Sequence, residues 1–139
     1  MDDELDPNDD DTDDDGLIDG LEDLNANGVF DEATDLSSGT RFDTDGDGLS
    51  DGLEVGLEIP QGSDTNLTLF QGDLDPGNLN TDPQDADTDD DGLADGSEDA
   101  NANGAMDSAT ETDPAVFDTD GDGLGDGLER GEVLSLIHI

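Results

Sequence analysis

Apolar and acidic positions behave differently in this sequence, because the acidic positions recur within it and the large apolar ones do not. Residues 11–34 match residues 87–110 at 18 of 24 positions, and residues 42–54 match residues 117–129 at 12 of 13. Five of the six differences in the first pair replace a large apolar residue with a smaller or polar one. A packed core responds to the loss of a single methylene group. The acidic and glycine positions, and not the large apolar ones, are therefore predicted to determine the structure.

The conserved part of the repeat predicts loops and turns. Four twelve-residue loops have Asp at positions 1, 3, 5 and 9, Gly at positions 6 and 10, Leu at 7 and Glu at 12; in chain order they are residues 11–22, 43–54, 87–98 and 118–129. The first loop is followed at once by further acidic residues, and glycine at position 10 disfavours a helix by roughly 1 kcal/mol. We therefore expect no flanking helices and only single helical turns near positions 9–12.

The composition leaves little material for a hydrophobic core. Only 29% of residues are apolar, and 43 acidic residues against two basic ones give a formal charge of −41. Ordering a residue costs roughly 1.5 kcal/mol of conformational entropy, which so little apolar burial cannot offset. Such a chain is expected to be disordered unless something other than burial stabilises it.

The spacing of the acidic residues supplies a candidate stabiliser. Asp at 1, 3 and 5, Gly at 6, a carbonyl at 7 and Glu at 12 is the ligand spacing of the EF-hand calcium loop, whose position 9 binds directly or through water. The predicted ligands are Asp11, Asp13, Asp15, the Leu17 carbonyl, Asp19 and Glu22; Asp43, Asp45, Asp47, the Leu49 carbonyl, Asp51 and Glu54; Asp87, Asp89, Asp91, the Leu93 carbonyl, Asp95 and Glu98; and Asp118, Asp120, Asp122, the Leu124 carbonyl, Asp126 and Glu129.

The type of ligand selects the metal. The chain has no cysteine and a single histidine, His138, so zinc and copper lack their usual ligands. Magnesium retains its water and requires a strict octahedron, whereas calcium accepts six to eight oxygens. Several calcium ions, about four to eight, are therefore expected.

A second type of loop follows the first and third loops directly. It keeps the 1-3-5-6-9 spacing but has Asn at positions 3 and 5, and its acidic residue falls one place late, at Asp35 or Glu111. We call these segments the Asn loops, and expect them to bind ions more weakly or to share ligands. Their predicted ligands are Asp23, Asn25, Asn27 and Asp31, and Asp99, Asn101, Asn103 and Asp107.

These sequences resemble the bacterial form of the calcium-binding thrombospondin type 3 repeats. The resemblance rests on DTDGDGLSDGLE at 43–54 and on TDPAVFDTDGDGLGDGLE at 112–129. It implies an irregular, calcium-cored tandem-repeat array of coil and turns, without a large hydrophobic core. It also implies a secreted or cell-surface parent protein, often an adhesin, in which the repeats act as a spacer or stalk beside other domains.

Two other functions compete with a calcium-stabilised spacer. A disordered acidic calcium buffer would bind ions without gaining structure, and a dockerin-like interaction module would need an apolar-patterned helix after each loop. The charge disfavours nucleic acid and anionic membranes as partners, and no apolar run could insert into a bilayer. The carboxylates are too many and too uniform, and the apolar residues too few to form a pocket, for an enzyme to be expected.

The repeat also suggests how the chain is divided. Residues 1–59 and 82–133 are predicted to be two calcium-binding units, joined by a linker at 60–81. Residues 134–139, LSLIHI, are what a transposase adapter used for sequencing libraries would encode. We interpret them as foreign to the native protein, the alternative being a short apolar tail.

Overall fold

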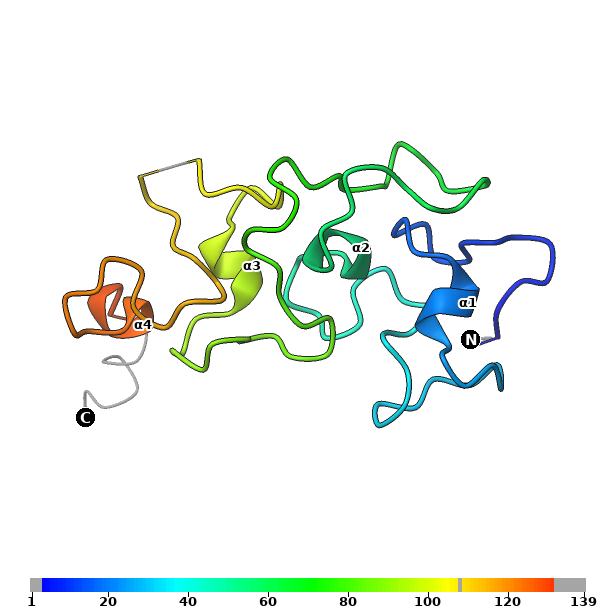
Figure 1. The fold of residues 1–139 in the computed structure, drawn as a ribbon, viewed down its shortest axis with the longest axis horizontal. Helices are drawn as coiled ribbons and strands as arrows, with labels where there is room; N and C mark the ends of the chain where they lie inside the picture. Colours follow the sequence, from blue (N-terminus) through cyan, green and yellow to red (C-terminus); the bar gives the residue numbers. More distant parts are fainter. Residues whose placement is uncertain (1–3, 108, 132–139) are drawn as a thin grey trace.

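Most of the chain lies in turns and bends. The computed structural model describes residues 4–107 and 109–131, and among these it contains no strand (Figure 1). Its helices are four single turns of four residues each: α1 (Asp19–Glu22), α2 (Asp51–Glu54), α3 (Asp95–Glu98) and α4 (Asp126–Glu129). The predicted irregular fold and the helical turns at positions 9–12 are confirmed. The predicted foreign tail, 134–139, lies outside the described residues.

Each helix ends after one turn for a local reason. α1 is followed by Asp23 with φ −83° and ψ 81°, which is not helical, and this residue already begins the first Asn loop. α2 is followed by Gly56 with φ +84°, and the Leu57 N–H donates to the Gly52 carbonyl at 2.9 Å, which is the Schellman pattern of a helix C-terminus. None of the described helices has the length and apolar character needed to cross a membrane.

The loops share one backbone conformation. The glycine at position 6 has a φ of +100° to +110° in all four loops, a region that side chains rarely adopt. Position 4 is also left-handed, at Asp14, Gly46, Asp90 and Gly121. These two residues turn the chain tightly enough for the carboxylates of positions 1, 3 and 5 to face one centre.

The interior of the molecule is acidic. Apart from two prolines, the buried apolar side chains among the described residues are four leucines, Leu17, Leu49, Leu53 and Leu93, each 2–3% exposed. The largest fully buried side chains are instead Glu22, Glu54 and Glu98, at 0–1% exposure. Burying carboxylates without a partner is strongly unfavourable. Because few apolar side chains are buried, the prediction of no large hydrophobic core is confirmed for the part of the chain that the structure describes.

The four loops stack in a row, with α1 and α4 at opposite ends (Figure 1). At each junction the position-10 glycine of one loop donates its N–H to Oδ2 of the position-5 aspartate in the preceding loop. These N···O distances are 2.9 Å for Gly52 to Asp15, 2.9 Å for Gly96 to Asp47 and 2.6 Å for Gly127 to Asp91. A Cβ atom at any of these glycines would collide with the backbone carbonyl of the same aspartate.

The contact at position 10 changes how this glycine is understood. The sequence argument gave it the role of preventing a helix, yet the glycine lies within a helical turn in each loop. At the three junctions its function in the fold is to let the preceding loop approach closely. Glycine is therefore needed because backbone meets backbone at this point.

Residues 60–81 lie against the loops. Near the first loop, the Gln61 N–H donates to the Gly16 carbonyl at 2.7 Å, and the Phe70 ring packs on the same glycine. Further along, the Ser50 N–H donates to Gln71 Oε1 at 3.1 Å, and the Leu74 N–H donates to the Asn103 carbonyl at 2.8 Å. The segment predicted as a linker thus contacts loops of both predicted units, while the division into units stays a prediction.

Candidate metal centre

The first loop shows how its carboxylates are oriented. Oδ2 of Asp11 accepts the Gly16 N–H at 3.1 Å, and Oδ1 of Asp15 accepts the Leu17 N–H at 2.7 Å. These bonds within the loop fix the orientation of both carboxylates, and Asp11 Oδ1 is left without a hydrogen-bond partner in the described chain. Oxygens of Asp11, Asp13 and Asp15 consequently lie within 4.8 Å of one another.

The glutamate at position 12 completes the first cluster. Oxygens of Asp15, Glu22 and Asp51 also lie within 4.8 Å of one another, so Asp15 joins the two groups. The Ser37 hydroxyl donates to Glu22 Oε1 at 2.8 Å and holds the carboxylate in place. The structure thus brings together the predicted ligands at positions 1, 3, 5 and 12.

The second loop repeats this arrangement, and the third repeats the hydrogen bond to its position-12 glutamate. Asp43, Asp45 and Asp47 form one group, and Asp47, Glu54 and Asp95 form the next. The Thr81 hydroxyl donates to Glu54 Oε1 at 2.9 Å, and the Thr112 hydroxyl donates to Glu98 Oε1 at 2.8 Å. A hydroxyl from a later part of the chain therefore positions the position-12 glutamate in each of the first three loops.

Seven buried carboxylate oxygens have no hydrogen-bond partner within the described chain. All belong to the first three loops, at positions 1, 3 or 12: Asp11 Oδ1, Asp13 Oδ2, Glu22 Oε2, Asp45 Oδ2, Glu54 Oε2, Asp89 Oδ2 and Glu98 Oε2. Buried polar groups in folded proteins are nearly always paired, with protein, water or an ion. The sequence predicted ligands at these same positions, and the donor set is oxygen only. The residues present therefore fit a hard divalent cation.

Burial and mutual repulsion make these carboxylates hold protons. Burial, together with the smaller effect of neighbouring carboxylates, raises the pKa of Asp13 to about 7, that of Asp15 to about 8 and that of Glu22 to about 10. The pKa of Glu54 is likewise raised to about 10 and that of Glu98 to about 8. A bound cation would stabilise the charged forms and displace these protons.

The aspartate at position 9 has a different environment from the other predicted ligands. Both oxygens of Asp19 accept hydrogen bonds from Thr12, one from its N–H and one from its hydroxyl, each at 2.9 Å. Asp51 and Asp95 accept the same pair from Thr44 and Thr88, and they also reach the cluster of the preceding loop. Binding of an ion by position 9 within its own loop stays a prediction.

The threonine at position 2 is a structural residue that the sequence reasoning missed. Its hydroxyl donates to the position-9 aspartate and accepts a backbone N–H from six residues earlier, such as that of Asp6 to Thr12 at 2.9 Å. The same acceptor role recurs at Thr44, Thr88 and Thr119. The signal was present, because threonine occupies position 2 of all four loops.

The Asn loops have the same turn but a different centre. The Gly28 N–H donates to Asp23 Oδ2 at 2.6 Å, as at position 6 of the other loops. However, the side-chain amide of Asn25 donates to Asp35 Oδ1 at 2.9 Å, and that of Asn101 donates to Glu111 Oε1 at 2.9 Å. The late acidic residues Asp35 and Glu111 thus accept hydrogen bonds from the asparagine amides of their own Asn loops.

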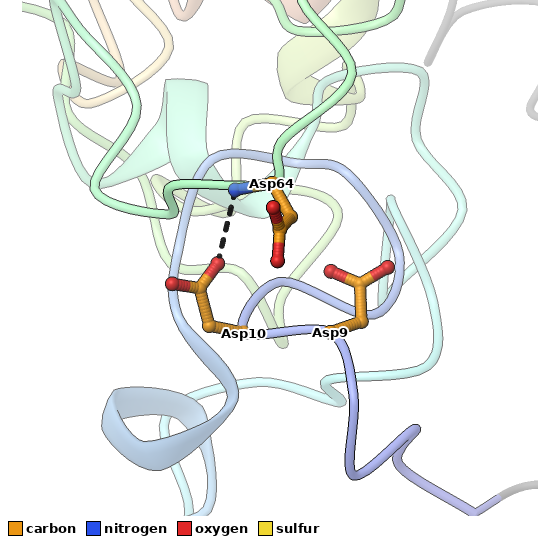
Figure 2. Close-up of side chains that lie close together, drawn as sticks. All are labelled: Asp9, Asp10 and Asp64. Carbon is orange, nitrogen blue, oxygen red and sulfur yellow. Dashed lines mark hydrogen bonds between the residues drawn. The ribbon is translucent and has the colours of Figure 1, made fainter.

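One further acidic group lies at the surface. Figure 2 shows Asp9, Asp10 and Asp64, with the Asp64 N–H donating to Asp10. Ser63 donates to Asp10 through both its N–H and its hydroxyl, and these bonds lower the pKa of Asp10. Because this carboxylate already has donors, the group serves to attach the segment near residue 63 to the first loop.

The chain was also compared with known proteins. No family model matches it, and neither the curated proteins nor the solved structures contain a significant match. The interpretation of the site therefore rests on its own geometry.

Proposed function

We propose that the chain is a calcium-binding structural module, in which ions held by the acidic loops stabilise the fold. The observation that carries the proposal is the set of buried, unpaired oxygens at the predicted ligand positions, above all Oε2 of Glu22, Glu54 and Glu98. A fold that buries these carboxylates needs a compensating positive charge. The described chain offers only Arg41 and Arg130 as positively charged side chains, and both are exposed, so the compensating charge comes from solution, as metal ions or as protons.

Calcium fits the donor set better than other common ions. The clusters contain carboxylate oxygens and no nitrogen or sulfur, and at least four acidic side chains converge on the first one. Calcium takes many oxygens in flexible geometry, whereas magnesium retains water. Extracellular calcium modules bind at about 10⁻⁴–10⁻³ M, a range that would fill the loops outside a cell.

The role that follows is mechanical. Loops stacked in a row, with bound ions between them, would give an elongated element whose stiffness depends on calcium. Together with the resemblance to thrombospondin type 3 repeats, this supports a spacer or stalk in a secreted or cell-surface protein, most simply one that takes part in adhesion.

The pH dependence of order tests the proposal, because its sign should reverse with calcium. Without ions, the raised pKa values mean that the folded chain binds more protons than the unfolded chain, whose groups titrate near 3.8 and 4.5. The stability of the ion-free fold should therefore fall as pH rises through the window from about 4 to about 10. With calcium the ligands must be deprotonated, so stability should rise with pH until the loops are filled.

Amide chemical-shift dispersion, recorded at pH 5 and at pH 8, shows how order changes with pH. It is measured once in excess chelator and once in excess calcium. We expect the chelated chain to be more ordered at pH 5 than at pH 8, and the calcium-loaded chain to show the opposite order. Equal dispersion with calcium and with chelator at pH 8 would contradict the proposal.

A further inference from the structure

The two ends of the row of loops remain open, whereas its three internal junctions are closed by the same contact. At the first end, Gly20 of α1 occupies position 10, but its N–H finds no acceptor among the described residues. Among the described residues, nothing lies within 4 Å of the place where a Cβ would stand. The neighbouring Leu21 is 42% exposed, whereas the equivalent Leu53 at the next junction is 3% exposed.

The opposite end shows the complementary half of a junction. Asp122 is at position 5 of the fourth loop, and its Oδ1 accepts the Leu124 N–H at 3.0 Å. Its Oδ2, the atom that accepts the glycine N–H at every internal junction, accepts none from the described chain. Leu124 is 46% exposed, although leucine at position 7 is 2–3% exposed in the other three loops.

From this complementarity we propose that the two ends bind each other between molecules. The α1 turn of a second copy of this chain would dock on the fourth loop, with its Gly20 N–H donating to Asp122 Oδ2. Leu21 and Leu124 would become covered, as Leu53 and the position-7 leucines of the first three loops are inside the row. Figure 1 places α1 and α4 at opposite ends of the long axis, so one molecule cannot close this contact on itself.

The geometry determines the type of assembly. The two surfaces differ, so the contact is heterologous, and repeated heterologous contacts that do not close produce open chains of molecules. The contact continues an interface that the structure contains three times. The contact area of a single junction is small, so this association belongs to the weak, transient class of interfaces.

Calcium is expected to control the association, and in this respect the inference rests on the proposed function. At the internal junctions the position-9 aspartate of the incoming loop joins the position-5 and position-12 carboxylates of the receiving loop, as Asp51 joins Asp15 and Glu22 within 4.8 Å. Asp19 of a second copy would in the same way join Asp122 and Glu129. Such a group of carboxylates repels an incoming acidic turn unless an ion lies among them.

The test compares the full wild-type chain with a Gly20→Ala variant. Each is measured alone at increasing concentration in saturating calcium. By analogy with the internal junctions, the added methyl group would meet the Asp122 carbonyl of the second molecule, while in the single molecule it meets none of the described residues. Sedimentation velocity should show the average mass of the wild type rising with concentration, and that of Gly20→Ala remaining at the monomer value. The Gly20 amide resonance should shift with concentration, whereas those of Gly52, Gly96 and Gly127 should not.

Two results would overturn the inference. One is a wild-type chain that stays monomeric across the series, and the other is a Gly20→Ala variant that associates as strongly as the wild type, which would place the contact elsewhere. A chelated sample separates the two proposals. Loss of amide dispersion on chelation, with a calcium-loaded chain that stays monomeric, would retain the proposed function and reject only this inference.

Discussion

Gly52→Ala is expected to destabilise the calcium-loaded chain by about 1–3 kcal/mol, the usual cost of inserting a methyl group into a filled space. The new Cβ would collide with the Asp15 backbone carbonyl and would approach the Leu57 side chain. It would also displace the Gly52 N–H from Asp15 Oδ2, an aspartate of the first cluster. The junction between the first two loops should therefore open, and the urea midpoint should fall.

Gly20→Ala is the matched control, because it makes the same change at the same position of the repeat. Gly20 is exposed, and no neighbour from the described part of the chain lies within 4 Å of the added methyl group. Alanine is favoured over glycine in a helical turn by roughly 1 kcal/mol. At dilutions where the chain is monomeric, this variant should be as stable as the wild type or more so. Equal losses in both variants would show that position 10 matters for the turn and not for the junction.

Glu22→Gln is expected to remove one calcium ion from the chain. Glu22 is fully buried, and its Oε2 has no partner among the described residues. Loss of an outer-shell partner typically weakens metal binding about 10–100-fold, and loss of a direct ligand should cost at least as much. Calorimetric titration should show one site fewer at millimolar calcium. The amides of the first loop and of α2 should also lose order, because Asp51 shares the cluster.

In chelator, the Glu22→Gln substitution should not reduce the order of the chain. Without an ion, Glu22 contributes a buried group whose charged form is strongly disfavoured, so a neutral amide should leave the ion-free chain no less ordered. Glu32→Gln is the control, since it removes the same charge from an exposed residue. If Glu22→Gln and Glu32→Gln retain equal calcium stoichiometry, Glu22 is not a ligand.

The local features of the loops could be predicted from the sequence because they depend on neighbours within twelve residues. The positive φ at Gly16 and the convergence of Asp11, Asp13 and Asp15 follow from spacing alone. The single helical turns begin at position 9 of each loop, and they end early because a glycine or a new loop comes soon after them. The low apolar content correctly indicated that the interior would not be a hydrophobic core.

The contacts between loops could not be predicted in the same way. Gly52 contacts Asp15, which is 37 residues earlier, and nothing in the composition of a single loop indicates that pairing. The segment 60–81 has the composition of a linker, yet its hydrogen bonds to Gly16 and Asn103 attach it to the loops. The role of Thr12 was also missed, because a hydroxyl next to many carboxylates is easily overlooked among stronger ligands.

The radius of gyration by small-angle scattering, in calcium, in magnesium and in excess chelator at neutral pH, tests most directly whether ions hold the fold. An unfolded chain of 139 residues is expected near 39 Å, about 2.0·N^0.6. We predict a value well below this in calcium, little compaction in magnesium, and a return to the unfolded value or above it in chelator. The same expanded value with calcium and with chelator would contradict the account and indicate a disordered acidic buffer. A compact chain in chelator would contradict it equally, because the fold would then not need ions.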